Sequence, residues 1–199
     1  MAKSSTRAAS DQRLVDRASG GDREAFGELY DRHVMPLYRH VYCMVNDRQL
    51  AEDLTAQTFL QALQAIARYE ERGLPFRAWL LRIAKNLATN HWRGQRNHNS
   101  SRNHGSERAI PSPEQFCEAK LREEEVWRAV RSLRGDQRQV IILRFVDGLS
   151  YPEVAQVLGK SIGAIRVVQY RALSALRRAL EDGDLGHSRV GARRLSRSA

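Results

Sequence analysis

The sequence predicts an all-α protein in which two small helical domains are joined by a flexible linker. Apolar residues recur at the three- and four-residue spacing of helices, the alternation typical of strands is nearly absent, and a stretch rich in Asn, Ser, Gly and Arg separates two helical blocks. We expect a first domain at residues 11–96, a linker at 97–112, a second domain at 113–182 and a basic, disordered tail at 183–199.

The first block begins with an apolar stripe that Pro36 interrupts. A proline inside a helix removes a hydrogen bond and clashes with the preceding turn, so we expect a kink or break in the helix that carries Phe26, Leu29, Tyr30, Leu37, Val41 and Met44. After a turn at Asn46 and Asp47, residues 50–67 predict a second helix. Its buried face is expected to contain Phe59, Leu63 and Ile66.

A third helix is expected from Phe76 to about Arg93, and its two faces differ. Apolar residues follow one side, namely Trp79, Leu80, Ile83, Ala84 and Leu87, whereas the other side carries Arg82, Lys85, Asn86, Thr89, Arg93 and Arg96. Aromatic residues lie near this cationic side at Tyr69, Phe76, Trp79 and Trp92. A positive track with aromatic platforms is typical of single-stranded nucleic acid binding, although Phe76 and Trp79 taken singly are more typical of a core.

The second block opens with a helix-start signal made by Ser112, Pro113 and Gln115. Helices are expected from there to about Leu133 and from Asp136 to Val146. The segment from Ser150 to Glu153 then forms a capping-box pattern that opens a short helix to Leu158.

A tight turn at Gly159, Lys160 and Ser161 separates this short helix from a last helix that runs to about Leu180, which is a helix-turn-helix pattern. We expect Val154, Ala155 and Leu158 to face a buried stripe of Ile165, Val168, Ala172 and Leu176. The opposite face would carry Gly163, Arg166, Val167 and Tyr170 toward the major groove, with Arg171 and Arg177 beside phosphates. The alternative is an ordinary helical hairpin that packs against another protein surface.

The charge and composition narrow the class of protein. A net charge of +10 indicates a polyanionic partner, either nucleic acid or an anionic membrane surface, unless the protein is merely a soluble basic one. No apolar run approaches the roughly 20 residues of a membrane helix, and the N-terminus lacks a signal-peptide core, so we expect a cytoplasmic protein. Cys43 and Cys117 are too few for a disulfide framework or a zinc site and are expected to be reduced thiols.

Catalytic and metal-binding patterns are missing from the sequence. There is no phosphate-binding Gly loop, HExxH, GxSxG or CxxC motif, so we expect no enzyme activity and no cofactor. His91, His98 and His104 fall at a helix end and in the linker, where the sequence brings no set of acidic or Cys metal ligands, so we expect no metal site.

At this point the chain resembles a known family. The segments AEDLTAQTFLQAL (51–63) and FRAWLLRIAKNLATNHWR (76–93) resemble region 2 of bacterial extracytoplasmic-function (group 4) RNA polymerase sigma factors. The segment LRGDQRQVIILRFVDGLSYPEVAQVLGKSIGAIRVVQYRALSAL (133–176) resembles their region 4, and ASGGDREAFGELYDRH (18–33) resembles their opening helix. The resemblance covers roughly residues 11–180, with both motif sets in the family's order.

The resemblance implies a factor that binds the β′ clamp helices and β flap of core RNA polymerase, and promoter DNA, in the cytoplasm near the nucleoid; an anti-sigma factor is a further partner that it admits. Region 2 would melt the −10 element and hold its non-template strand, with the loop from Tyr69 to Leu74 at its pocket, through Tyr69, Arg72, Phe76, Trp79, Arg82, Lys85, Asn86, Asn90 and Arg93. Region 4 would read the −35 duplex through Ser161, Gly163, Arg166, Val167, Tyr170 and Arg171. Core polymerase would contact Asp53, Leu54, Gln57 and Phe59.

The chain departs from the family pattern at three places. The usual DLxQE motif reads Asp53 to Gln57 as DLTAQ, Asn90 stands where Asp is common, and the usual TVKSRL reads AIRVVQ over residues 164–169. The −35 sequence that it reads is therefore expected to differ from the commonest one. The competing interpretation is a stand-alone helix-turn-helix regulator whose first domain senses a ligand or dimerises; such a domain would not need a cationic aromatic face.

Overall fold

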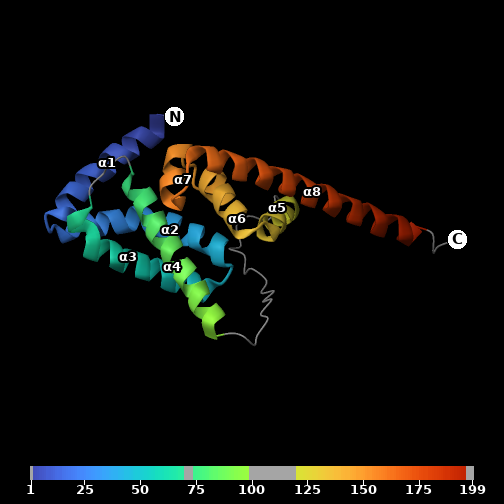
Figure 1. The fold of residues 1–199 in the computed structure, drawn as a ribbon, viewed down its shortest axis with the longest axis horizontal. Helices are drawn as coiled ribbons and strands as arrows, with labels where there is room; N and C mark the ends of the chain where they lie inside the picture. The colour runs from blue at the N-terminus through green and yellow to red at the C-terminus, as the bar shows by residue number, and fades with distance from the viewer. Residues whose placement is uncertain (1, 70–73, 99–119, 196–199) are drawn as a thin grey trace. The chain divides into compact units, whose positions relative to one another are not determined.

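The computed structural model describes residues 2–69, 74–98 and 120–195, and within these ranges every regular element is helical (Figure 1). The predicted all-α class with two helical domains is therefore confirmed. Two compact units are present, one formed by Met1–Arg108 with Ile142–Ile162 and the other by Ala109–Ile141 with Gly163–Ala199. Among the described helices, none is long and apolar enough to cross a membrane.

The first unit contains the helices α1 (Ala2–Ser19), α2 (Arg23–Val45), α3 (Arg48–Ala65), η1 (Ile66–Arg68), α4 (Phe76–His98), η2 (Ile142–Val146) and α7 (Tyr151–Leu158). Side chains define the ends of α2 and α3. Asp22 and Asp47 cap them by accepting hydrogen bonds from the backbone N–H groups of Ala25 and Leu50, at 3.1 and 3.0 Å. Asn46 adopts a left-handed conformation (φ 52°) between the two helices, which confirms the predicted turn.

Helix α2 continues through Pro36, so of the predicted kink or break the break does not occur. The cost of a proline in a helix is met when packing holds the turns on both sides of it. Leu29 lies before Pro36 and is fully buried, while Leu37, Val41 and Met44 follow it and are also buried. Contacts of α2 with α1, α3 and α4 thus keep the helix intact.

Helix α3 is buried along a different line from the one predicted. Its buried face consists of Ala51, Leu54, Thr55, Thr58, Phe59 and Ala62, and Ile66 of η1 extends it. Leu63 was expected on this face, but it is 49% exposed, because it lies about 100° around the helix from Ala62. The hydroxyls of Thr55 and Thr58 are satisfied within the helix, donating to the carbonyls of Ala51 and Leu54 at 2.7 Å.

Helix α4 buries Phe76 and a row of apolar and small residues, namely Ala78, Leu80, Leu81, Ala84 and Ala88. It contacts α2, α3 and α7. Helical structure extends past the predicted end near Arg93 to His98, and the predicted linker beyond it lies largely outside the described residues. Because α4 packs through its apolar side, its cationic side stays exposed to solvent.

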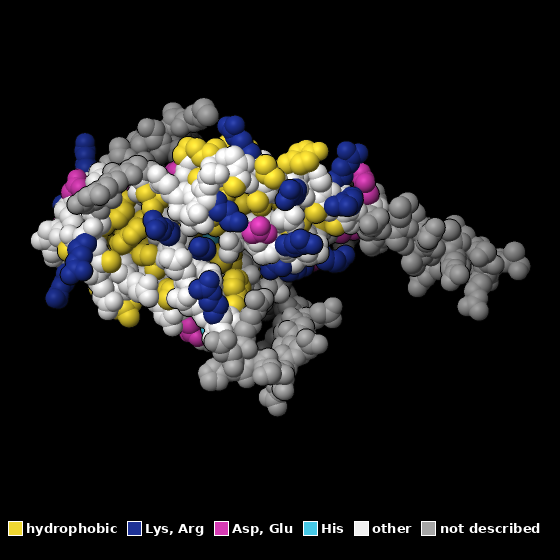
Figure 2. Space-filling view, in the orientation of Figure 1, with side chains coloured by type: hydrophobic (Ala, Val, Ile, Leu, Met, Phe, Trp, Pro, Cys, Tyr) yellow, Lys and Arg dark blue, Asp and Glu magenta, His cyan; other side chains and the backbone are white. Residues whose placement is uncertain are grey.

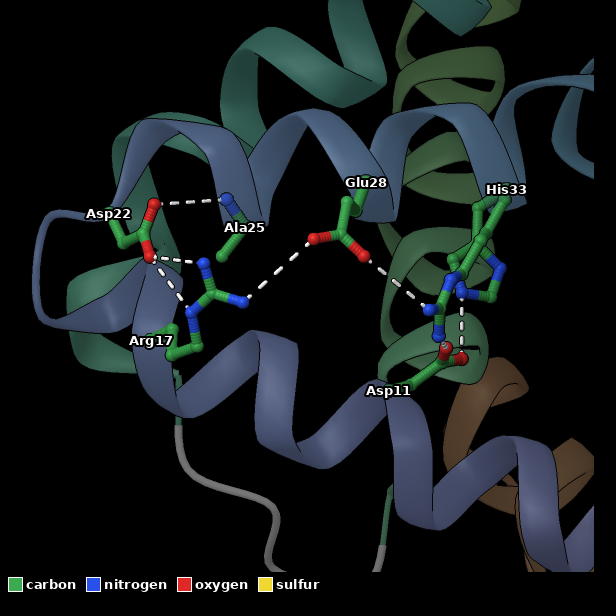
Figure 3. A network of polar contacts seen from close by, with 7 residues as sticks. Asp11, Arg17, Asp22, Ala25, Glu28 and His33 are labelled. Atoms are coloured by element: carbon green, nitrogen blue, oxygen red, sulfur yellow. Dashed lines mark hydrogen bonds and ion pairs between the residues drawn. The ribbon is translucent and has the colours of Figure 1, made fainter.

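A polar network joins α1 to α2 (Figure 3). A carboxylate oxygen of Asp11 in α1 lies 2.8 Å from Nε2 of His33, and Arg32 donates to the other oxygen at 3.2 Å. Burial alone would raise the pKa of Asp11, but the hydrogen bond and charge of His33, together with Arg32, outweigh burial and hold that pKa below its ordinary value. Asp11 is therefore an ionised group that fixes α1 on α2.

The second unit contains α5 (Lys120–Ser132), α6 (Gly135–Ile141) and the long α8 (Ile162–Leu195; Figure 1). Its core consists of Val130, Leu133, Ile141 and Ala172, with Trp127, Ala175 and Leu176 packed against it. Ala172 and Leu176 were expected to face the short helix of the helix-turn-helix, but they pack on residues of α5 and α6. The apolar periodicity identified the buried side of α8, but it did not identify the helices against which that side packs.

Arg138 of α6 supports the end of α5. Its guanidinium donates to the backbone carbonyls of Arg131 and Leu133, which are acceptors that a helix C-terminus leaves without partners. Burial, and secondarily the positive charge of Arg131, lower the pKa of Arg138. The junction between α5 and α6 is thus held by a cation at a helix C-terminus.

Two predicted ends in this half of the chain need correction. The expected helix from Asp136 to Val146 ends as an α-helix at Ile141 and continues as the π-helical η2, whose wider turns bury Ile142 and Leu143. The tail that was expected to be disordered is helical as far as Leu195, where α8 ends. The predicted start signal at Ser112, Pro113 and Gln115, and Cys117, lie outside the described residues.

The capping box that opens α7 is confirmed. Ser150 Oγ accepts from the N–H of Glu153 at 3.4 Å, and the Glu153 carboxylate accepts from the N–H of Ser150 at 2.6 Å. Gly159 closes the helix with φ 65°, a backbone conformation that favours glycine. The short helix of the predicted helix-turn-helix therefore begins and ends at the expected residues.

Candidate nucleic-acid interface

The cationic side of α4 forms an exposed polar face. Arg82, Asn86, Asn90 and Arg93 are exposed, and their spacing of three and four places them along one side of the helix over roughly 16 Å. Lys85 is half-buried beside them, and Thr89 is held by a hydrogen bond from its hydroxyl to the Lys85 carbonyl at 2.8 Å. The face offers guanidinium, ammonium and amide groups to a polyanion along one helix.

An aromatic cluster lies at the N-terminal end of α4. The rings of Tyr69 and Trp79 are 4.6 Å apart, and Phe76 lies 6.0 Å from Tyr69 and 5.7 Å from Trp79. The Tyr69 hydroxyl donates to the carbonyl of Leu74 at 2.6 Å, so it ties together the two described ends of the intervening loop. Arg72, which was predicted to contact DNA, lies in that loop and outside the described residues.

The three aromatic residues differ in how much surface they offer. Tyr69 and Trp79 are half-buried, whereas Phe76 is 3% exposed. A base cannot stack on a ring that is buried to this extent, so in this conformation Phe76 supports the two other rings from beneath. Trp92 is 36% exposed further along α4 and offers a second aromatic surface near Arg93.

Helix α3 presents a separate exposed face. Of the four residues expected to contact polymerase, Asp53 and Gln57 are exposed, whereas Leu54 and Phe59 are buried at 3% and 4%. Phe59 packs beneath the ring of Tyr30, with ring centres 4.6 Å apart. The exposed face instead adds Leu60 and Leu63, which are 56% and 49% exposed. The signal that could have identified Leu60 is its register, seven residues after Asp53 on the same side of the helix.

The residues expected to read duplex DNA are exposed on α8 and the turn before it. Ser161, Gly163, Arg166 and Arg171 are exposed, and Val167 and Tyr170 are 49% and 74% exposed. Ile165 and Ala172 are fully buried, so the helix separates a packed side from a side that is open to solvent. Every residue in the predicted reading set therefore has an accessible surface.

A groove in the second unit extends this surface. It is lined by Tyr170 and Arg171 of α8 together with Ser132, Arg134, Gln137, Ser174 and Arg178. Sequence reasoning missed Arg134 and Arg178, whose only signal was their charge. On the face drawn in Figure 2, Lys and Arg side chains are more frequent than Asp and Glu side chains, as the net charge requires.

Within the described residues, no group of three or more His, Cys, Asp or Glu side chains is arranged to hold a metal ion. Cys43 is a partly buried thiol.

Comparison with known proteins identifies two regions. Residues 29–98 match the family Sigma-70 region 2, and residues 123–176 match Sigma-70, region 4. The ECF RNA polymerase sigma factor BldN of Streptomyces coelicolor is 40% identical over 172 residues, covering 85% of this chain and 65% of BldN. The ECF RNA polymerase sigma factor ShbA of Streptomyces griseus is 33% identical over 180 residues, covering 84% of this chain and 94% of ShbA.

A solved structure shares the fold. The sigma factor RpoE of Bartonella quintana, in a complex with the anti-sigma factor NepR, aligns with a TM-score of 0.69 and 27% identity. The alignment covers 78% of this chain and 96% of that one.

Proposed function

The chain belongs to the extracytoplasmic-function sigma factors of the sigma-70 family, and on that premise we propose that it is a group 4 factor which binds core RNA polymerase and directs it to specific promoters. It acts in the cytoplasm, at the nucleoid, where its DNA and polymerase partners are found. It has no catalytic residue and uses no cofactor. An anti-sigma factor is a further partner, as for the related RpoE of Bartonella quintana.

Region 2 holds the non-template strand of the melted −10 element. The observation that carries this proposal is the exposed α4 face, on which Arg82, Asn86, Asn90 and Arg93 lie along one helix that begins at the Tyr69 and Trp79 rings. Cations along such a track bind backbone phosphates, and half-exposed rings stack on extruded bases, which offsets the cost of extruding them. Lys85 and Arg72 add positive charge, and Phe76 acts by supporting the rings.

Core polymerase binds the exposed face of α3. Asp53 and Gln57 provide polar contacts there, and Leu60 and Leu63 provide the apolar surface that an interface core requires. Leu54 and Phe59 contribute by holding α3 in place from within the first unit. The Gln and the acidic residue of the family's DLxQE motif are missing from this chain, and the exposed Leu60 and Leu63 provide apolar contact area in their place.

Region 4 reads the −35 element as a duplex. Arg166 contacts guanine edges or phosphate, Val167 contacts a thymine methyl, and Tyr170 lies on the same exposed side of α8. Ser161, Gly163 and Arg171 approach the backbone, and the groove that Arg134 and Arg178 line adds further phosphate contacts.

Run-off transcription with purified core polymerase tests the proposal. The templates are promoter fragments that the holoenzyme binds and so selects from random genomic DNA. We expect promoter-specific transcripts only when the chain is added. Arg82→Ala is expected to reduce open-complex formation while binding of the −35 duplex stays at wild-type strength. Arg48→Ala is the matched control, because Arg48 is an exposed cation on α3 that pairs with Glu52 at 2.9 Å.

A stand-alone regulator is the alternative outcome of the same experiment. Such a protein would bind duplex DNA through α8 without associating with core polymerase, and Arg82→Ala would have no effect on it. Duplex binding without polymerase association or specific transcripts would therefore overturn the proposed function.

A further inference from the structure

The aromatic cluster at the start of α4 is in contact with a histidine of α2. The ring of His33 lies edge-on to the ring of Phe76, with ring centres 5.5 Å apart, and the His33 side chain is buried. Phe76 in turn lies 6.0 Å from Tyr69 and 5.7 Å from Trp79, the two rings that are only half-buried. The orientation of His33 therefore affects where the accessible rings lie, because closely packed buried rings leave no space in which one of them could turn alone.

A carboxylate of α1 sets the orientation of His33 (Figure 3). Oδ2 of Asp11 lies 2.8 Å from Nε2 of His33, and both side chains are buried. An ionised carboxylate only accepts hydrogen bonds, so Nε2 carries the proton and donates it to this contact. The other oxygen of Asp11 accepts from Arg32 at 3.2 Å, so the buried carboxylate has a partner at each oxygen. The hydrogen bond from Nε2 thereby fixes the direction in which the imidazole ring points.

Helix α1 also reaches the aromatic cluster through η1. It contacts both η1 and α4, and its Val15 is fully buried. Tyr69 directly follows η1, and the N–H of Tyr69 donates to the carbonyl of Ile66 at 3.0 Å. Ile66 is itself buried. The ring cluster is thus supported by α1 from two sides, through η1 and through the histidine that the α1 carboxylate holds.

We propose that α1, through the hydrogen bond from His33 to Asp11, positions the rings of Tyr69 and Trp79 for stacking on an unpaired base. Asp11 and His33 are positioning residues, because both are buried and act through the rings rather than by contact with DNA. The stacked base rests on the proposed function, whereas the positioning of the rings rests on the contacts described above. Asp11 precedes the region 2 match, so the proposal gives α1 a role in strand binding that the family match does not cover.

The negative charge of Asp11 distinguishes positioning from a general electrostatic effect. Removal of a carboxylate makes the basic chain still more positive, and a more positive chain binds a polyanionic strand more tightly. Displacement of the rings instead weakens the part of binding that depends on bases, because stacking supplies that part. The two effects have opposite signs, so a loss of base-dependent binding in a variant without Asp11 cannot come from the change in net charge.

Fluorescence anisotropy of the full-length chain with two kinds of labelled single strand tests the proposal. One probe is the best bound of oligo-dA, oligo-dC and oligo-dT, and the other is an abasic strand of the same length and charge, about 12 nucleotides long. The wild type should bind the probe with bases more tightly by about fivefold or more, which is the effect of one stacked base. Asp11→Ala should lower this ratio of affinities by about threefold or more, while its affinity for the abasic strand stays unchanged or rises.

Two variants are matched controls. Asp11→Asn changes the net charge by the same amount as Asp11→Ala, but its amide oxygen can still accept the hydrogen bond from Nε2 of His33, so the ratio should stay near the wild-type value. Arg17→Ala removes a different contact between α1 and α2, the ion pair of Arg17 with Asp22 at 2.7 Å, at the opposite end of the network in Figure 3. Both affinities should fall with the lost cation, and their ratio should not change.

Circular dichroism of the free chain separates displacement of the rings from unfolding. Asp11→Ala should keep the far-ultraviolet signal of its helices and lose part of the near-ultraviolet signal that rings in fixed geometry give. A wild-type ratio of affinities or a wild-type near-ultraviolet signal in Asp11→Ala overturns the proposal, as does a loss of helical content or an equal fall of the ratio in either control variant. If the wild type itself binds the abasic strand as tightly, the base-holding part of the proposed function fails, and the near-ultraviolet signal alone decides whether α1 positions the rings.

Discussion

Removal of one arginine from the α4 face should change the salt dependence of single-strand binding by a calculable amount. Arg82 is exposed and lies on the same side of α4 as Arg93, with Lys85 half-buried beside them. Arg82→Ala removes one cation from this face without touching a buried residue, so the fold should be unaffected. Any loss of binding then reports the contact of that cation with DNA.

The magnitude follows from counterion release. Each phosphate contact on a single strand contributes about 0.7 to the slope of log K against log salt, so the three cations of the face give a slope near −2. Between 50 and 200 mM salt, affinity should fall about twentyfold for the wild type and about sevenfold for Arg82→Ala.

Fluorescence anisotropy with a labelled single-stranded oligonucleotide measures both slopes on the full-length chain. Arg48→Ala lowers the net charge by the same amount on a different helix, where Arg48 pairs with Glu52. Equal slope changes in the two variants would show that binding depends only on total charge. The α4 face would then lose its role as the single-strand track.

Three further outcomes are expected. Ser150→Ala removes the cap of α7 and should lower the free energy of unfolding of the first unit by about 1 kcal/mol. Chemical denaturation measures this change, and Ser161→Ala at the next turn is the comparison variant. Asp11→Asn should change how the free energy of unfolding responds to acid. The pKa of Asp11 is lower in the folded protein than in the unfolded one, so its stabilising effect is present above the unfolded pKa and is lost as pH falls through the folded pKa. The wild type should therefore lose stability on acidification where the variant does not. Arg166→Ala should weaken binding to the −35 duplex by about 1–3 kcal/mol if the contact is bidentate, measured by titration, and unchanged affinity would remove Arg166 from the reading face.

Local signals in the sequence located the turn between α2 and α3 and both ends of α7 correctly. The side chains of Ser150 and Glu153 each accept a hydrogen bond from the backbone N–H of the other residue. Asn46 ends α2 in a left-handed conformation, and Asp47 caps α3 directly after it. These interactions need no information from distant parts of the chain, which is why pattern recognition suffices for them. The exposed reading set on α8 followed from a three- and four-residue period for the same reason.

The features that sequence reasoning missed depend on tertiary contacts. Pro36 does not break α2 because buried residues on both sides hold it, and Leu63 is exposed because the buried line of α3 runs through its threonines. The exposure of Leu60 likewise depends on which side of α3 meets its neighbours. The pairing of Asp11 with His33 joins residues 22 positions apart on two helices, which no local period could indicate.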